Sequence, residues 1–168
     1  MPAIIFTSDY AAIGFVLALV SFFVAEQIGG VILPAIRRGG VKVQRRNAGS
    51  GFLVIFSWVA VLGFTVVFSK IGFGLLPDWI YYTGVAAMFA GIAFRQWAIA
   101  VLGRYFSRVI GVQKEHKVVE TGPYRLIRHP SYTGVLIFYV GMGLAVQSLA
   151  AILVAIAIFD IAMVTGFL

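Results

Sequence analysis

Long apolar runs separated by short polar segments are the dominant pattern of this sequence. A helix needs roughly 20 residues to cross about 30 Å of hydrocarbon, and several runs approach or exceed that length. The pattern predicts five helices, at about 10–36, 52–69, 79–102, 130–146 and 149–168. Because the fourth run is short, four helices plus a re-entrant hairpin is an alternative. Both interpretations describe an all-α, polytopic membrane protein.

The connections between these runs differ in character. Gln147 and Ser148 alone separate the last two runs, which predicts a tight C-terminal helical hairpin. Residues 37–51 are basic and glycine-rich without apolar periodicity, and we interpret them as a solvated connection. Residues 103–129 alternate charged and apolar positions. Ordered connections of this length are usually functional, so we expect this segment to fold beneath the helices as an ordered loop on the cytoplasmic side.

Composition narrows the class further. The 168 residues are 61% hydrophobic and only 11% charged, which fits one membrane-embedded domain over 1–168. The absence of cysteine excludes disulfides, thiolate zinc sites and cysteine nucleophiles. Two histidines, His116 and His129, cannot build a metal site by themselves, so we expect no metal.

The basic residues indicate a topology. Twelve of the thirteen lie in two segments on the same side of the predicted helices, and only Lys70 lies opposite. The positive-inside rule then places the N-terminus outside, and the 103–129 loop and the C-terminus in the cytoplasm. The net charge of +7 is interpreted as topology and contact with anionic lipid, and no nucleic-acid partner is expected. No basic residue precedes the first run, which favours a mature helix over a signal peptide. The twelve residues are Arg37, Arg38, Lys42, Arg45, Arg46, Arg95, Arg104, Arg108, Lys114, Lys117, Arg125 and Arg128.

Two acidic residues lie inside apolar runs, Glu26 and Asp160. Charges are costly in lipid and are functional candidates by default, but we favour an interhelical hydrogen bond or ion pair for each. Glycines also recur at heptad spacing, which predicts close helix packing: Gly84 and Gly91, and Gly134 and Gly141.

A dense polar island occupies residues 120–134, directly before an apolar run. Gly122 and Pro123 indicate a turn, since proline fixes φ and glycine permits a tight approach. His129 precedes Pro130, which biases it away from helical geometry and makes it the boundary residue. Pro130 suits the first helical position.

The start of this predicted helix offers groups for a ligand. The backbone N–H groups of Ser131 and Tyr132 would be free there to hold a carboxylate or phosphate. Tyr132 lies one turn beyond His129, so both side chains can face one cavity. The alternative is that Arg125 and Arg128 anchor to lipid headgroups while His129 caps the helix. For the island as a whole we favour the ligand site.

The island also resembles the signature of the isoprenylcysteine carboxyl methyltransferase family, and phospholipid N-methyltransferases share a looser form of it. The resemblance implies a membrane-embedded enzyme that uses S-adenosylmethionine to methylate a carboxylate on a lipid-modified substrate. The matching segments are Arg95-Gln-Trp97, Leu102-Gly103, Phe106-Ser107, His116-Lys-Val-Val119, Gly122-Pro-Tyr124 and Arg128-His-Pro-Ser-Tyr132-Thr-Gly134.

The same resemblance implies which residues bind the cofactor. One segment would line the adenosine, a turn would close over it, and the start of the fourth helix would contact the sugar or amino-acid portion. These positions are His116, Val118 and Val119 for the first, Gly122 and Tyr124 for the second, and His129 and Tyr132 for the third, with Gln113 added by proximity.

In one respect the sequence departs from the family pattern. The resemblance implies a charged tail after the last hairpin, with an arginine and paired glutamates, whereas this sequence stops at Leu168. We expect the catalytic residues to belong to such a tail, with Arg128 as a lesser candidate within the sequence. We also expect the native gene product to extend past Leu168.

The charge of the acceptor favours one reaction. A carboxylate is already nucleophilic at neutral pH, whereas an amine must first lose a proton to a base. Candidate bases are few, which favours a carboxylate or another oxygen or sulfur nucleophile. The resemblance implies that the carboxylate belongs to an isoprenylcysteine-like or other lipidic substrate. The expected partners are the lipid bilayer and that lipidic or prenylated substrate. The alternatives are a phospholipid N-methyltransferase acting on an amine headgroup and a non-catalytic lipid-binding protein of the same fold.

Overall fold

The computed structural model describes residues 9–37, 59–67, 71, 76–103, 106 and 120–167. Within this part of the chain every element is helical, which confirms the all-α prediction. Residues 59–67 are helical as well. The remaining elements are α1 (Asp9–Gln27), the π-helix η1 (Ile28–Ile32), α2 (Leu33–Arg37), α4 (Ile80–Leu102), the 3₁₀-helix η3 (Gly122–Arg125), α5 (Pro130–Ala145) and α6 (Leu149–Phe167).

Two of the helical segments are long and apolar enough to cross a membrane. They are Asp9–Ile36, with 28 residues, and Ile80–Leu102, with 23 residues. The α5 helix has 16 residues, which corresponds to about 24 Å and is shorter than the hydrocarbon core of about 30 Å. The count of five membrane spans therefore stays a prediction, and so does its alternative of a re-entrant hairpin.

The first predicted helix, at 10–36, is found with a π-helical turn inside it. Pro34 has no N–H, and its ring displaces the carbonyl one turn before it. The N–H of Leu33 reaches back five residues to the carbonyl of Ile28 and so accommodates the extra residue. The turn begins one residue after α1 ends at Gln27, and it buries Gly29 and Gly30. Such π-turns often occur beside functional sites.

Heptad-spaced glycines allow α4 and α5 to pack backbone to backbone, as the sequence predicted. A Cβ atom built on Gly84 would lie 2.3 Å from the backbone nitrogen of Ala145, and one on Gly91 would lie 2.6 Å from that of Phe138. Gly141 approaches Met88 and Gly134 approaches Arg95 in the same way. Because the pairs descend along α5 as they ascend along α4, the two helices are antiparallel.

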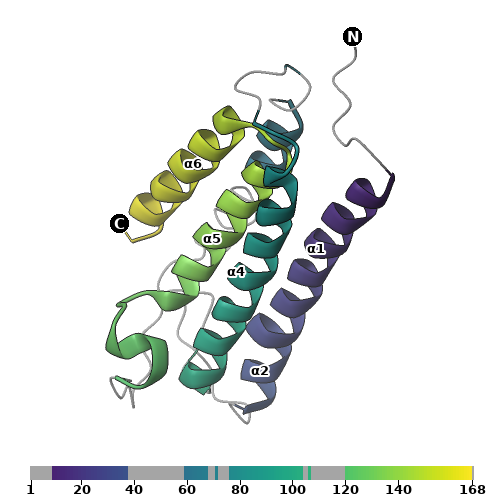
Figure 1. Cartoon of the computed structure of the whole chain (residues 1–168). Helices are drawn as coiled ribbons and strands as arrows, with labels where there is room; N and C mark the ends of the chain where they lie inside the picture. Colours follow the sequence, from purple (N-terminus) through teal and green to yellow (C-terminus); the bar gives the residue numbers. More distant parts are fainter. Residues whose placement is uncertain are drawn as a thin grey trace.

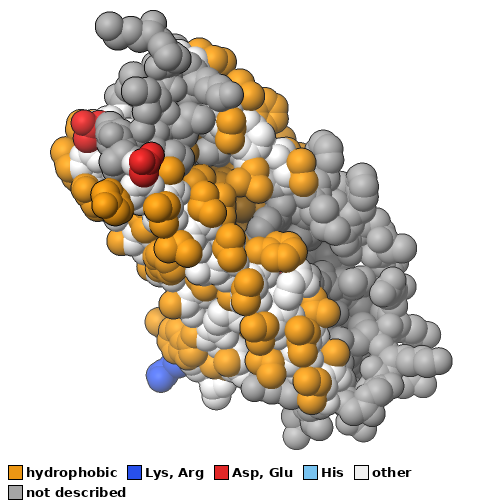
Figure 2. All heavy atoms as spheres, turned by 90° about the vertical axis from the view of Figure 1, so that its right-hand side faces the viewer, with side chains coloured by type: hydrophobic (Ala, Val, Ile, Leu, Met, Phe, Trp, Pro, Cys, Tyr) orange, Lys and Arg blue, Asp and Glu red, His pale blue; other side chains and the backbone are white. Residues whose placement is uncertain are grey.

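The other long helices flank this pair (Figure 1). One side of α1 is buried against the bundle through Phe15, Ala18 and Phe22, and α6 packs on the opposite side of α5. The outward residues of α1 are apolar, including Val16 and Phe23. Figure 2 shows a broad apolar surface on this side, and among the residues described there the charged side chains lie toward the ends. That surface suits a lipid environment.

The predicted tight hairpin between the last two helices is confirmed. Three residues separate Ala145 from Leu149, and Gln147 has φ +55°. The Gln147 carbonyl accepts a 2.8 Å hydrogen bond from the N–H of Leu76, and its side-chain amide donates to Asp78 at 3.1 Å. This turn is therefore fastened to the segment that leads into α4.

Candidate functional site

We call the end of the bundle where α4 stops and α5 starts the polar end. The predicted turn at Gly122 and Pro123 is found there as η3, and Gly122 has φ +58°. A Cβ atom on Gly122 would lie 3.1 Å from Cγ2 of Val101 and 3.7 Å from Cζ2 of Trp97. Both the positive φ and the close approach require glycine, so the turn is seated on the last turns of α4.

Tyr124 lies in this turn and is half-buried. Burial raises the pKa of its hydroxyl above the ordinary value, the positive charge of Arg95 acts in the opposite direction, and Tyr132 raises the pKa further. Tyr124 of η3 is therefore close enough to Arg95 of α4 and Tyr132 of α5 for both to act on its hydroxyl. The raised pKa keeps the Tyr124 phenol in its neutral form, which can donate a hydrogen bond to a ligand.

At the start of α5 the helix boundary is as predicted. His129 is the N-cap residue and Pro130 is the first residue of the helix. The ring centroids of His129 and Tyr132 lie 6.1 Å apart, which brings together two predicted cofactor residues. His129 is exposed and Tyr132 is half-buried. Although His129 occupies the N-cap position, its side chain makes no capping hydrogen bond to the helix. This argues against the alternative in which the His129 side chain serves to cap α5.

The predicted availability of both N–H groups at this helix start is wrong for Tyr132. Its N–H donates to the carbonyl of His129 at 3.1 Å, and the N–H of Thr133 donates to the same oxygen at 3.1 Å. The first turn is tight because the carbonyl of His129, whose backbone has φ −130° and ψ 59°, accepts from both donors. The N–H groups of Tyr132 and Thr133 are therefore not available to an anion at this helix start.

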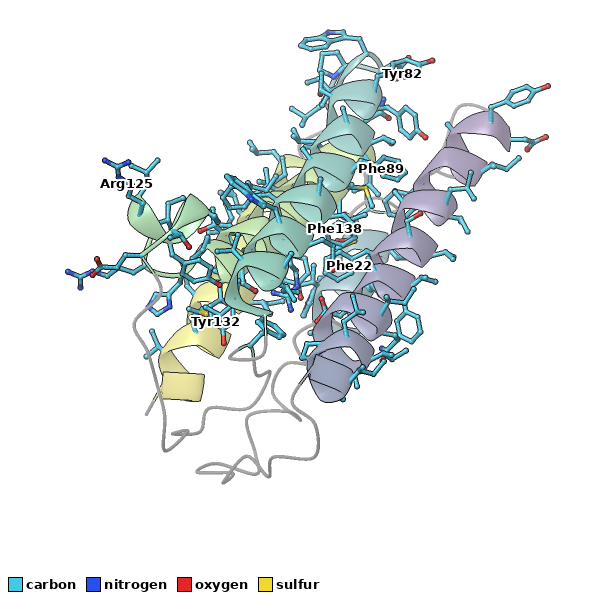
Figure 3. All side chains as sticks on the ribbon, turned by 90° about the horizontal axis from the view of Figure 1, so that it is seen from below. Phe22, Tyr82, Phe89, Arg125, Tyr132 and Phe138 are labelled. Atoms are coloured by element: carbon cyan, nitrogen blue, oxygen red, sulfur yellow. The ribbon has the colours of Figure 1, made fainter. Side chains whose placement is uncertain are left out.

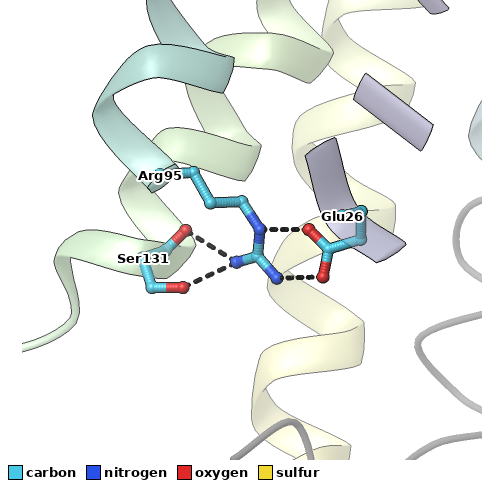
Figure 4. A network of polar contacts seen from close by, with 3 residues as sticks. All are labelled: Glu26, Arg95 and Ser131. Atoms are coloured by element: carbon cyan, nitrogen blue, oxygen red, sulfur yellow. Dashed lines mark hydrogen bonds and ion pairs between the residues drawn. The ribbon is translucent and has the colours of Figure 1, made fainter. Parts of the chain in front are cut away.

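A buried ionic network of Glu26, Arg95 and Ser131 lies directly behind this turn, and it was not predicted from the sequence (Figure 4). Arg95 donates from Nε to Glu26 at 2.5 Å and from Nη2 to the same carboxylate at 2.7 Å. Its Nη1 donates to the Ser131 hydroxyl at 2.6 Å and to the Ser131 carbonyl at 3.0 Å. The favoured interpretation of Glu26 as an interhelical ion pair is thereby confirmed. Arg95 lies within α4 and is buried there. Counting it among the loop residues that indicate the topology was therefore wrong.

The sequence contained a signal for this pair. Glu26 and Arg95 are opposite charges within apolar helices. Each lies in the half of its helix that the predicted topology places toward the cytoplasm. Intramembrane charges are usually paired with one another. Asp160, the other acidic residue in an apolar run, is exposed on α6.

The structure places the other candidates as follows. Arg128, the lesser catalytic candidate, is exposed between η3 and α5, and Arg125 points away from the bundle (Figure 3). Four predicted cofactor residues lie outside the described residues: Gln113, His116, Val118 and Val119. Four lie within them and gather at the polar end: Gly122, Tyr124, His129 and Tyr132.

These features define a helical membrane protein with a polar, aromatic candidate site at one end of a glycine-packed helix pair. The model of the isoprenylcysteine carboxyl methyltransferase (ICMT) family matches residues 84–166, which include most of α4, the polar island, α5 and most of α6. Over this segment, just under half of its length, the chain is similar to this family.

Named plant proteins are similar to the chain. Two from rice, Oryza sativa subspecies indica and japonica, are each called probable protein-S-isoprenylcysteine O-methyltransferase and are 32% identical over 134 residues. That alignment covers 76% of this chain and 66% of each rice protein, slightly less than two thirds of its length. Protein-S-isoprenylcysteine O-methyltransferase B of Arabidopsis thaliana is 42% identical over 65 residues, which cover 38% of this chain and 33% of that protein.

A solved structure is similar as well. It is described as the eukaryotic intramembrane Ras methyltransferase ICMT without a monobody. The match has a TM-score of 0.47 and 21% sequence identity, and it covers 88% of this chain and 55% of that chain.

Proposed function

We propose that this protein is an integral-membrane methyltransferase that transfers a methyl group from S-adenosylmethionine to the carboxylate of an isoprenylcysteine-like or other lipidic substrate. The observation that carries the proposal is the convergence of Tyr124, His129 and Tyr132 at the polar end, within the segment that the family model matches. The match to the family model supports the reaction class, and the apolar outer surface suits a substrate that arrives through lipid.

The residues at the polar end fit this cofactor in their chemistry. Adenine and ribose need hydrogen-bonding groups and apolar contact, which the two tyrosines and His129 can provide. Tyr124 and Tyr132 are half-buried, and their neighbour His129 is exposed, so the cluster can be reached from outside the bundle. The cofactor, when bound, supplies an activated methyl group on a sulfonium. Gln113, His116, Val118 and Val119 belong to the proposed site through the family resemblance.

The chain's own contribution to such a reaction is positioning. A carboxylate is already ionised at neutral pH, so no side chain has to remove a proton from it. What the site must do is hold acceptor and donor in line and exclude water around them. Neutral phenols suit this task because they donate hydrogen bonds without adding charge beside the reacting groups. The exposed guanidinium of Arg128 can attract the acceptor carboxylate to the polar end.

We place the polar end in the cytoplasm, with the N-terminus on the other side of the membrane. The distribution of basic residues supports this orientation. It gives a water-soluble cofactor access from the cytoplasm, while a prenyl chain enters laterally between helices.

Binding and turnover test the proposal in two steps. Isothermal calorimetry on the purified protein in detergent should show saturable binding of S-adenosylmethionine. Labelled methyl transfer should then occur to an S-prenylated cysteine with a free carboxylate, and not to its carboxamide analogue. Transfer to the amine headgroup of a phospholipid instead would favour the N-methyltransferase alternative. Absence of both binding and transfer would leave the non-catalytic lipid-binding alternative.

A further inference from the structure

Arg95 donates four hydrogen bonds, and it makes them deep in the bundle. Four of its five N–H donors are engaged, two by the Glu26 carboxylate and two by Ser131. The three residues are 7% (Arg95), 7% (Glu26) and 8% (Ser131) exposed. A guanidinium held on both edges in this way has one orientation only.

Stability alone does not account for such a network. Removing two charges from water is costly, and well-packed apolar residues often stabilise a fold equally well or better. Elsewhere along α4 and α5, glycines and buried apolar side chains bring the two helices together. The network joins α1, α4 and α5 beside the first turn of α5, which points to a role in the geometry of the polar end.

The residues held by Arg95 adjoin the proposed cofactor residues. Ser131 lies directly before Tyr132 and two residues after His129 in the first turn of α5. The same turn is held again by Gly134, where a Cβ atom would lie 2.8 Å from the backbone nitrogen of Arg95. Arg95 also acts electrostatically on Tyr124 in η3, lowering the pKa that burial raises.

We propose that Arg95 is a positioning residue for cofactor binding, which rests on the function proposed above. Its guanidinium fixes the first turn of α5, so that the side chains of His129 and Tyr132 are set before the ligand arrives. Glu26 supplies the opposite charge that holds the guanidinium in place from α1. Preorganisation of this kind increases affinity because less ordering remains to be done on binding.

Ser131→Ala is the most selective test, because it removes one bond to Arg95 and leaves the ion pair intact. The dissociation constant for S-adenosylmethionine, measured by calorimetry per mole of folded protein, should rise about tenfold. The KM for the cofactor should rise similarly, while kcat at saturating cofactor stays near the wild-type value, because a preset geometry affects binding first. A purely structural role would lower the melting temperature and leave the dissociation constant of the folded protein unchanged.

Tyr81→Phe is the matched control. The Tyr81 hydroxyl donates a 2.7 Å hydrogen bond to the carbonyl of Ala11 and so also links α4 to α1. It lies 14 residues before Arg95, about 21 Å away along the helix. Its loss should lower the melting temperature without changing cofactor affinity.

A charge-free double variant, Glu26→Leu with Arg95→Met, covers the case in which single changes impair folding. It keeps the bundle apolar and removes the tether, so it should fold and still bind the cofactor at least tenfold more weakly. Wild-type affinity in both Ser131→Ala and the double variant would overturn the inference while leaving the proposed function intact. A wild-type protein that fails to bind the cofactor would overturn both.

Discussion

Phe22 of α1 stacks on Phe138 of α5, with ring centroids 4.0 Å apart and an interplanar angle of 22°. Both side chains are almost fully buried, and Figure 3 shows them between α1 and α4. Phe22 precedes Glu26 by one helical turn, so this stack adjoins the ionic network on the same face of α1. The apolar and ionic contacts together hold α1 against the helix pair that carries the site.

Replacing both rings tests whether they stabilise the fold as a pair. In a double-mutant cycle of Phe22→Leu and Phe138→Leu, unfolding in detergent should show a coupling free energy of about 0.5–1.5 kcal/mol. Phe89 is 44% exposed and serves as the control. A cycle of Phe22→Leu with Phe89→Leu should show additive effects, and equal coupling in both cycles would argue against a specific stack.

The glycine-packed interface makes a second prediction. A Cβ atom on Gly141 would lie 2.7 Å from the backbone nitrogen of Met88, so Gly141→Ala must push α4 and α5 apart. We expect it to cost about 1–3 kcal/mol of unfolding free energy, as overpacking does.

Gly63 is the natural control for that change, because a Cβ atom there would meet nothing within 4 Å. Gly63→Ala should be neutral or should stabilise the helix by up to about 1 kcal/mol, since alanine has the higher helix propensity. Melting temperatures of the two variants in one detergent would compare them. A similar decrease in melting temperature in both variants would show that the close approach of Gly141 to Met88 is not the cause of the destabilisation.

Sequence reasoning succeeded wherever the cause was local. Pro130 fixes the start of α5 through its own φ, Gly122 permits its turn, and Gln147 with Ser148 leaves no length for a loop. Glycine spacing also predicted close packing, because only a missing side chain allows backbones to approach.

It failed where the outcome depends on a distant partner. The sequence indicated that Glu26 needed a partner but did not identify Arg95, which is 69 positions away. The tight first turn of α5 was missed because it depends on the carbonyl direction at His129, a backbone detail. The π-turn was missed for a similar reason: Pro34 signals a distortion without specifying which hydrogen bond shifts.

The side chains at the start of α5 give a third prediction. His129→Ala and Tyr132→Phe should each weaken binding of S-adenosylmethionine by roughly 0.5–1.5 kcal/mol, the usual cost of one lost neutral hydrogen bond. Tyr82→Phe is the control, since Tyr82 is 74% exposed near the start of α4, at the opposite end of the bundle. Calorimetric titrations of the three variants and the wild type that superimpose would end the assignment of His129 and Tyr132.

The raised pKa of Tyr124 makes a final prediction about alkaline stability. Burial favours the neutral phenol in the folded protein, so the pKa there exceeds the ordinary value of 10.0. Below about pH 10 the phenol is protonated in both states, and its ionisation does not affect unfolding. As the pH rises from there through the raised folded-state pKa, the unfolded chain loses its proton first and the folded state loses relative stability. Tyr124→Phe lacks this ionisation.

The comparison with Tyr124→Phe isolates that one group, because all other ionisations are shared. The difference in unfolding free energy between wild type and variant should stay constant from pH 7 to about pH 9 and shift in favour of the variant above about pH 10. Denaturant unfolding in detergent at a series of pH values measures this difference. A difference that stays constant through the alkaline range would mean that the Tyr124 hydroxyl is as well solvated in the folded protein as in the unfolded chain, and it would remove Tyr124 from the buried cluster at the polar end.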